Sequence, residues 1–136
     1  MTPFKLQIIT PDGVIFDGMT DNVIVRTTVG DKGILAHHEP YVAAITISKF
    51  KVRIDGEFRY GAISSGVIKV GKEKTVILAQ SCEWADEIDV EWAKRSEEDA
   101  LERIKAKKSS QDYNMAELKL KRALNRISVH DSYAKK

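Results

Sequence analysis

Residues 75–104 read TVILAQSCEWADEIDVEWAKRSEEDALERI, and the spacing of the apolar side chains changes within this stretch. Its first part, Thr75 to Ala79, is a run of β-branched and aliphatic residues typical of a strand. After Asp89 the apolar residues recur every three or four positions, which predicts a helix. Glu97 interrupts the apolar stripe of this helix, which consists of Val90, Ala93, Ala100, Leu101 and Ile104. We therefore divide the chain into residues 1–86 and residues 87–136.

The part before the change consists of short β-favouring runs that alternate with turn signals. About ten such strands at close spacing predict a β-sandwich or barrel, and the lack of helix-length patterns between them disfavours a βαβ fold. The turn signals are Pro11-Asp12-Gly13, Asp17-Gly18, Gly30 to Gly33 and Asp55-Gly56. The runs include residues 4–8, 14–16, 23–25, 43–54 with a register change near Lys49, 58–63, 67–70 and 75–79.

The part after the change predicts two helices. Asp89 is a plausible N-cap of the first helix, residues 109–112 form a loop, and Asp112 is the candidate cap of the second helix. A second apolar stripe consists of Tyr113, Ala116, Leu120, Ala123, Leu124 and Ile127. Two helices joined by so short a loop fold back as an antiparallel hairpin. Because both stripes are thin and rich in alanine, the hairpin either docks permanently on the sandwich or can leave it.

Charge is segregated within the helical part. Residues 87–103 hold seven acidic and three basic side chains, whereas residues 104–136 hold nine basic and three acidic ones. The second helix is therefore a basic arm, which suits an acidic partner surface or the acidic first helix. Arg122 and Arg126 lie one turn apart on one face, where they can grip phosphate oxygens or pair with carboxylates such as Glu98 and Glu102.

Composition excludes several classes of protein. The net charge of +2 lacks the basic excess of a nucleic-acid binder, and the longest apolar runs are far shorter than the roughly 20 residues of a membrane span. The sequence begins without the pattern of a signal peptide. Cys82 is the single cysteine, so no internal disulfide can form. These features predict a soluble cytoplasmic protein without direct membrane insertion, which reaches any membrane through partners.

Catalytic and metal-binding patterns are missing from the sequence. No glycine-rich phosphate loop is present. His37-His38-Glu39 is the best metal candidate, but neighbouring strand residues point to opposite faces and no second ligand cluster accompanies them. Cys82 lacks a nearby base, and we interpret Trp84 and Trp92 as packing residues at the sandwich–hairpin junction. We expect a non-catalytic protein that needs no metal and no cofactor.

One alternative function is a β-barrel RNA-binding module with a basic helical tail. An RNA-binding sheet needs exposed aromatic side chains close together on one face. The four Phe and four Tyr residues of this chain are scattered along the sequence. We therefore expect no nucleic-acid partner.

Several of these segments resemble the epsilon subunits of bacterial F-type ATP synthases, and they follow one another in the same order. Residues 33–40, GILAHHEP, are similar to that family's G-[IV]-L-P-x-H-x-P segment, with Ala36 in place of the usual proline. The opening strand running into Pro11-Asp12-Gly13 resembles the family's start. Residues 65–70, 75–79 and 83–93 resemble its last sandwich strands and the entry to its helices. The resemblance covers about residues 4–129.

The resemblance implies a ten-stranded sandwich with a helical hairpin in the central rotor stalk of a proton- or sodium-translocating ATP synthase. The sandwich would contact the gamma subunit and the c-ring, on the cytoplasmic side of the membrane. The arm would either fold on the sandwich or extend to the catalytic beta and alpha subunits and inhibit ATP hydrolysis. Its partner-binding residues would then be Lys119, Lys121, Arg122 and Arg126.

The resemblance also implies ATP as a regulatory ligand, with or without magnesium. Some members of the family carry an I-D-x-x-R-A motif at the start of the first helix and two arginines on the second. The matching residues here are Glu83, Ile88, Asp89, Ala93, Arg122 and Arg126. Trp92 stands where the motif has arginine, which removes a cation near the expected nucleotide and leaves ATP binding open.

Overall fold

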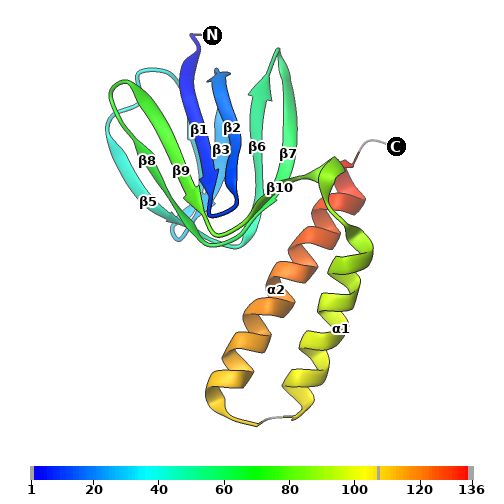
Figure 1. Ribbon diagram of the computed structural model, residues 1–136. Coiled ribbons are helices and arrows are strands. Elements are labelled where there is room, and N and C mark those ends of the chain that lie inside the picture. The colour runs from blue at the N-terminus through cyan, green and yellow to red at the C-terminus, as the bar shows by residue number, and fades with distance from the viewer. Residues whose placement is uncertain (1, 107, 135–136) are drawn as a thin grey trace. The chain divides into compact units, whose positions relative to one another are not determined.

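The computed structural model describes residues 2–106 and 108–134. The chain forms two compact units, residues 1–84 and 85–136. The first unit is built from strands and the second from helices (Figure 1). The predicted fold class is confirmed. The strands are β1 (Phe4–Thr10), β2 (Gly13–Thr20), β3 (Val23–Thr27), β4 (Gly30–Ile34), β5 (Tyr41–Ile45), β6 (Ser48–Ile54), β7 (Glu57–Ile63), β8 (Gly66–Val70), β9 (Lys74–Ala79) and β10 (Cys82–Trp84).

The strands form one continuous sheet that folds over into two layers. The order is β10-β7-β6-β3-β5-β8-β9-β1-β2, and β4 pairs with β3 outside this path. The pairing of β3 with β5 is reduced to Thr27 opposite Ile45, and the sheet turns over at this point. The hydroxyl of Thr20, at the end of β2, donates a hydrogen bond of 2.6 Å to the backbone carbonyl of Arg53 on β6, which links the last strand of the path to a strand near its other end.

The core lies between the two layers, and alternate strand residues point into it. On β1, for example, Leu6 and Ile8 are fully buried while the residues beside them are partly exposed. Trp84 is 3% exposed and packs against the rings of Phe16 and Phe50, whose centroids lie 6.2 and 5.3 Å from its own. Trp84 is therefore a core residue of the sandwich, as its apolar surroundings require.

Two details of the strand prediction were wrong. Gly30 to Gly33, which we expected to be a turn, belongs to β4, and the actual turn lies just before it. Gly30 opens β4 with a φ of 119°, a conformation that favours glycine. The expected strand 43–54 is two strands, β5 and β6, interrupted at Thr46-Ile47. The hairpin turn at Asp55-Gly56 is confirmed, because both residues have positive φ, 52° and 84°.

The second unit begins with a 3-10 turn, η1 (Ala85–Glu87), followed by α1 (Val90–Ala106) and α2 (Ser110–Tyr133). The two helices lie against each other and run in opposite directions (Figure 1). Two predictions need correction here. Ser109, not Asp112, caps α2, since its hydroxyl accepts a hydrogen bond from the backbone N–H of Asp112. The buried residues of α1 are Ala93, Ser96 and Ala100. The polar residue within the buried stripe is therefore Ser96, whereas we expected it to be Glu97.

Except for Val129 on α2, the buried side chains of α1 and α2 are those of alanine and serine. Ala116 and Ala123 on α2 are buried like the alanines of α1, whereas Leu101 and Leu124 from the predicted stripes are 41% and 47% exposed. Small residues let two helix backbones approach closely, but they bury little apolar area. The hairpin therefore depends on polar contacts between its helices more than the sandwich does.

Candidate functional site

The first helix begins at the motif where the resemblance places a nucleotide. Oδ1 of Asp89 accepts a hydrogen bond of 3.0 Å from the backbone N–H of Trp92, and the backbone N–H of Ala93 bonds to the carbonyl of Asp89. Asp89 is therefore the predicted N-cap of α1. Because one carboxylate oxygen already bonds to the helix, the observed role of Asp89 is to fix the start of α1.

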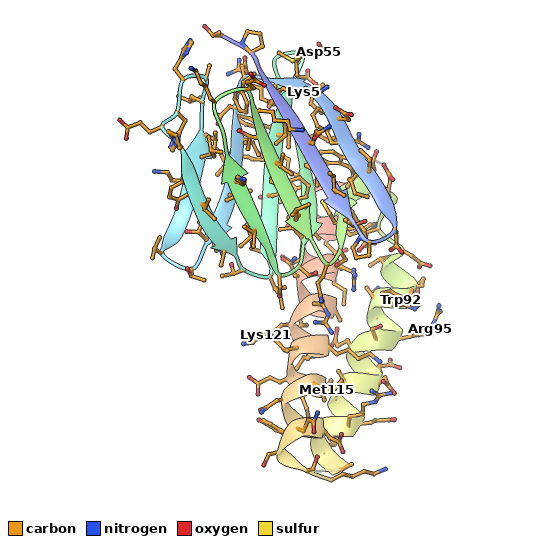
Figure 2. The ribbon with its side chains drawn as sticks, turned by 60° about the vertical axis from the view of Figure 1, so that its left-hand side comes forward. Lys5, Asp55, Trp92, Arg95, Met115 and Lys121 are labelled. Atoms are coloured by element: carbon orange, nitrogen blue, oxygen red, sulfur yellow. The ribbon has the colours of Figure 1, made fainter. Side chains whose placement is uncertain are left out.

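Trp92 and Arg126 join the two helices of the hairpin. The guanidinium carbon of Arg126 lies 5.1 Å from the centre of the Trp92 indole, within the range of a cation–π interaction. Trp92 lies in the first turn of α1 and is 47% exposed (Figure 2). The indole that replaces the motif's arginine thus binds one of the two arginines expected to meet the nucleotide's phosphates.

A second contact between the helices is centred on Asp99, which the sequence analysis did not single out. The ammonium of Lys119 on α2 donates a hydrogen bond to Oδ2 of Asp99, and Nε of Arg103 lies 3.1 Å from the same oxygen. The hydrogen bond from Lys119 and the charge of Arg103 hold the pKa of the Asp99 carboxyl below its ordinary value. The spacing of Asp99 and Arg103, four residues apart on one helix, was a signal that could have identified this carboxylate.

The four residues predicted for the basic arm have different surroundings. Lys119 binds Asp99, and Lys121 lies 3.9 Å from a carboxylate oxygen of Glu117 on its own helix. Arg126 stacks on Trp92. Arg122 is half-buried and has no ion-pair partner within residues 2–106 and 108–134. Arg122 is consequently the residue of this group best suited to an added anion.

The residues of the predicted nucleotide site are divided between the two units of the chain. Ile88, Asp89, Ala93, Arg122 and Arg126 belong to the helical unit, whereas Glu83 lies on β10 in the sandwich unit. Ile88 and Ala93 are buried apolar residues, 6% and 0% exposed, and can support such a site without bonding to phosphate. Within the hairpin, the group best suited to bind an anion is the guanidinium of Arg122. The Trp92–Arg126 pair lies on the same two helices.

A different kind of candidate site lies on the outer face of the sandwich layer β5-β8-β9-β1-β2. Five apolar residues stand opposite one another in register across all five strands: Ala44, Val67, Leu78, Ile9 and Val14. Val14, Val67 and Leu78 are 61%, 43% and 53% exposed. We call these five residues the apolar row. At about 4.8 Å between strands, its four intervals span roughly 19 Å.

On one side of the apolar row, the residues become more polar with distance from the row toward the strand ends. The next row in register is Val42, Lys69, Val76, Gln7 and Asp17. Beyond it lie Lys5 and Lys74, of which Lys5 forms an ion pair of 2.7 Å with Asp17. A contiguous exposed apolar strip with a charged border is typical of a protein–protein interface.

One pair of aromatic side chains lies close together on the sandwich, although the aromatic residues are scattered along the sequence. Phe58 and Tyr60 are two residues apart on β7 and therefore share a face of the sheet. The ammonium of Lys51 lies 4.5 Å from the centre of the Phe58 ring and 5.7 Å from that of Tyr60. One lysine ammonium thus lies over both rings, and this pair makes a poor stacking platform for bases.

The remaining candidate residues show no reactive arrangement. Nδ1 of His38 lies 2.7 Å from the backbone carbonyl of Glu39, and its ring packs edge-on against Tyr41. Within residues 2–106 and 108–134, no group of three His, Cys, Asp or Glu side chains is placed to hold a metal ion. Burial of Cys82 in the sandwich core raises the pKa of its thiol to about 12, which keeps it protonated and unreactive. Among the described helices, none is long and apolar enough to span a bilayer.

Both units of the chain match family models. Residues 3–85 match the model described as "ATP synthase, Delta/Epsilon chain, beta-sandwich domain", and residues 86–131 match the "long alpha-helix domain" of the same chain. The chain belongs to the ATP synthase delta/epsilon chain family. Among curated members, the ATP synthase epsilon chain of Ruminococcus albus is 47% identical over 130 residues, covering 95% of this chain and 97% of that protein. The epsilon chain of Bacillus mycoides is 37% identical, covering 96% and 98%.

Chains from two solved ATP synthase structures share the fold at low sequence identity. A chain of the Euglena gracilis mitochondrial ATP synthase, from a structure of OSCP, F1 and c-ring, superposes with a TM-score of 0.77 at 21% identity. The match covers 92% of this chain and 79% of that one. A chain of the Tetrahymena thermophila central stalk and c-ring gives 0.54 at 14% identity, covering 63% and 69%. At these identities the agreement shows a shared fold and nothing beyond it.

Proposed function

We propose that this chain is the epsilon subunit of an F-type ATP synthase and works in its central stalk as a non-catalytic rotor subunit. Its sandwich docks on the gamma subunit and the c-ring, and so couples rotation of a proton- or sodium-driven c-ring to the catalytic head. In a bacterial cell this places it at the cytoplasmic side of the membrane, attached through the complex. Membership of the delta/epsilon family supports this role over RNA binding.

The apolar row is the observation that carries the docking proposal. Its side chains stand in water in the isolated chain, and covering them releases about 25 cal/mol for each Å2 of apolar area. Leu78, at the centre of the row, is about half exposed. Burying the exposed half of a leucine contributes roughly 1 kcal/mol, so the five residues together can anchor a stable interface. We assign this face to the gamma subunit.

Leu78→Lys tests the docking. A lysine at the centre of the row cannot be buried without a partner charge, so binding to purified gamma should weaken by at least about tenfold. Leu118→Lys is the matched control, because Leu118 is a comparably exposed leucine on α2. Loss of gamma binding in the first variant and its retention in the second supports the proposal. Equal binding by both variants refutes this face as the gamma site.

The hairpin supplies the regulatory part of the proposed function. Extended toward the beta and alpha subunits, it presents the basic residues of α2 to an acidic surface and inhibits ATP hydrolysis. The thin alanine-rich contact between α1 and α2 supports a unit that rearranges at small cost. Removal of residues 89–136 should leave assembly intact and raise ATP hydrolysis by the complex. Unchanged hydrolysis by a fully assembled complex contradicts the inhibitory role.

ATP is the proposed regulatory ligand of the folded hairpin, and Arg122 is its main phosphate contact. Arg122 is chosen because it has no carboxylate partner within residues 2–106 and 108–134, whereas Arg126 already stacks on Trp92. Calorimetric titration with ATP, with and without magnesium, should show binding that Arg122→Ala weakens more than Arg126→Ala. Absence of binding at millimolar ATP contradicts the role of ATP. The chain would then be a coupling subunit whose arm is controlled by other signals.

A further inference from the structure

The second layer of the sandwich has a hollow on its outer face. Four residues stand in register across β4, β3, β6 and β7: Gly33, Ile24, Lys51 and Tyr60. The space above them is a hollow of about 410 Å3, bordered also by Arg26, Asp31 and Lys49. We call it the basic hollow. It lies on the layer opposite to the apolar row, since β3 and β5 mark the point where the sheet turns over.

Gly33 lines the hollow and contributes no side chain to it. The residue opposite it on β3 is Ile24, and a Cβ added at Gly33 would meet Cγ1 of Ile24 at 3.7 Å, an ordinary contact distance. A side chain at position 33 would therefore not clash at its Cβ, and its outer atoms would extend into the hollow. The floor of the hollow is the apolar side chain of Ile24, while its walls are polar.

The walls carry an excess of positive charge. Arg26, Lys49 and Lys51 are basic, and Asp31 is the one acidic residue that borders the hollow. Nε of Arg26 lies 2.8 Å from Oδ1 of Asp31. The hydrogen bond from Arg26, and to a smaller extent the charges of Lys49 and Lys51, lower the pKa of the Asp31 carboxyl. Among the residues that border the hollow, three are basic and one is acidic, a formal excess of two positive charges.

The shape of the basic hollow suits an extended segment of protein. Four strands at about 4.8 Å spacing span roughly 14 Å, the length of about four extended residues. The aromatic rings beside the hollow are not free to stack on bases, because the ammonium of Lys51 lies over Phe58 and Tyr60. An apolar floor between cationic walls fits the stem and the carboxylates of acidic side chains.

We propose that the basic hollow binds a short, extended acidic segment of a partner protein, with two carboxylates held by Lys49, Lys51 and Arg26. The site is independent of the proposed gamma interface, because the two lie on opposite layers of the sandwich. A sandwich of this kind can therefore hold a second partner while its apolar row is covered.

The test uses the full-length chain labelled with 15N and a blocked tetraglutamate peptide at low salt, followed by NMR. The amide signals of Ile24, Gly33 and Lys51 should shift saturably with peptide, and the affinity should fall as salt is added. The double variant Lys49→Gln, Lys51→Gln should bind at least about tenfold more weakly, as expected from loss of two charge-assisted bonds. Gly33→Val should weaken binding as well, because its side chain would occupy part of the hollow while every charge is kept.

Lys69→Gln is the matched control, since Lys69 is an exposed strand lysine on the opposite layer. It should leave peptide binding unchanged. Shifts spread over all lysines, or equal losses in the control and the double variant, overturn the proposal. The proposal is also overturned if inorganic phosphate shifts the same amide signals with an affinity equal to that of the peptide. It is overturned as well if an oligouridylate shifts them with a higher affinity. Failure here leaves the gamma-binding test on Leu78 unaffected.

Discussion

The contact between Trp92 and Arg126 gives the most quantitative prediction for the hairpin. About half of the Trp92 surface is covered, which corresponds to roughly 100 Å2 for a tryptophan and about 2–3 kcal/mol of burial free energy as an upper estimate. The stack itself should add about 0.5–1 kcal/mol, the usual range for a partly exposed cation–π pair. Trp92→Ala should therefore lower the free energy of opening the hairpin by up to about 4 kcal/mol.

Arg126→Ala alone cannot isolate the stack, because Arg126 makes a further interaction besides the one with Trp92. A double-mutant cycle removes this problem by comparing both single variants with the double variant. Hydrogen exchange at the amide of Ala93, which bonds to the carbonyl of Asp89, reports opening at the start of α1 in the full chain. The coupling should appear as a roughly two- to fivefold non-additivity in the opening equilibrium.

The control cycle combines Trp92→Ala with Lys121→Ala, since Lys121 pairs with Glu117 on its own helix. Its coupling should be zero within error. A Trp92–Arg126 coupling no larger than that of the control pair would refute the stack as a link between the two helices. Arg126→Lys should retain only part of the coupling, because an ammonium lacks the planar surface that stacks on an indole.

Three further predictions concern packing, pH and the core. Gly66→Ala should destabilise the sandwich by about 1–3 kcal/mol or more, because its Cβ would lie 2.3 Å from the carbonyl oxygen of Leu78. Gly33→Ala is the control, because its Cβ would lie at an ordinary contact distance, and it should change the free energy of unfolding, measured by chemical denaturation, by less than about 0.5 kcal/mol. The hydrogen bond from Lys119 lowers the pKa of the Asp99 carboxyl from the ordinary value of 3.8, so as the pH falls this carboxyl is protonated in the unfolded chain before it is protonated in the folded one. The stability that the Asp99 ion pair gives the hairpin is therefore lost as the pH falls from about 3.8 downward. An NMR titration should show a midpoint below 3.8 that rises in Lys119→Gln, and a midpoint at or above 3.8 in the unaltered chain contradicts the ion pair. Phe50→Ala, at a residue 1% exposed and packed on Trp84, should cost about 3–5 kcal/mol in urea unfolding, and a loss below 1 kcal/mol would show that the core can collapse around it.

The strands were predictable from sequence because each is short, alternates in polarity and ends at a turn signal. Asp55-Gly56 was identified correctly since the tight hairpin turn requires positive φ at both residues. Gly30 to Gly33 was misread because two glycines look like a turn, whereas one opens a strand and the other leaves a hollow on its face. Local composition cannot distinguish these uses of glycine, which depend on the neighbouring strands.

The candidate sites were less predictable, since they depend on cross-strand register and on contacts between helices. The apolar row unites residues from β1, β2, β5, β8 and β9, and no window of the sequence contains it. The Asp89 cap was predictable because capping is local. The pairing of Lys119 with Asp99, 20 residues away, was not predicted, because it depends on how the two helices face each other.

The parallel pairing of β1 with β9 has a consequence for synthesis of the chain. Lys5 stands opposite Lys74, and positions 5 and 74 are 69 residues apart. At about 5–20 residues per second, the ribosome needs roughly 3–14 seconds to make the second strand after the first, and during this time β1 has only β2 to pair with. Ile9 and Val14 come from the beginning of the chain, whereas Val67 and Leu78 come from near the end of the sandwich. The face that we assign to gamma therefore does not exist on a nascent or truncated sandwich, and a rotor partner that binds this face selects finished subunits.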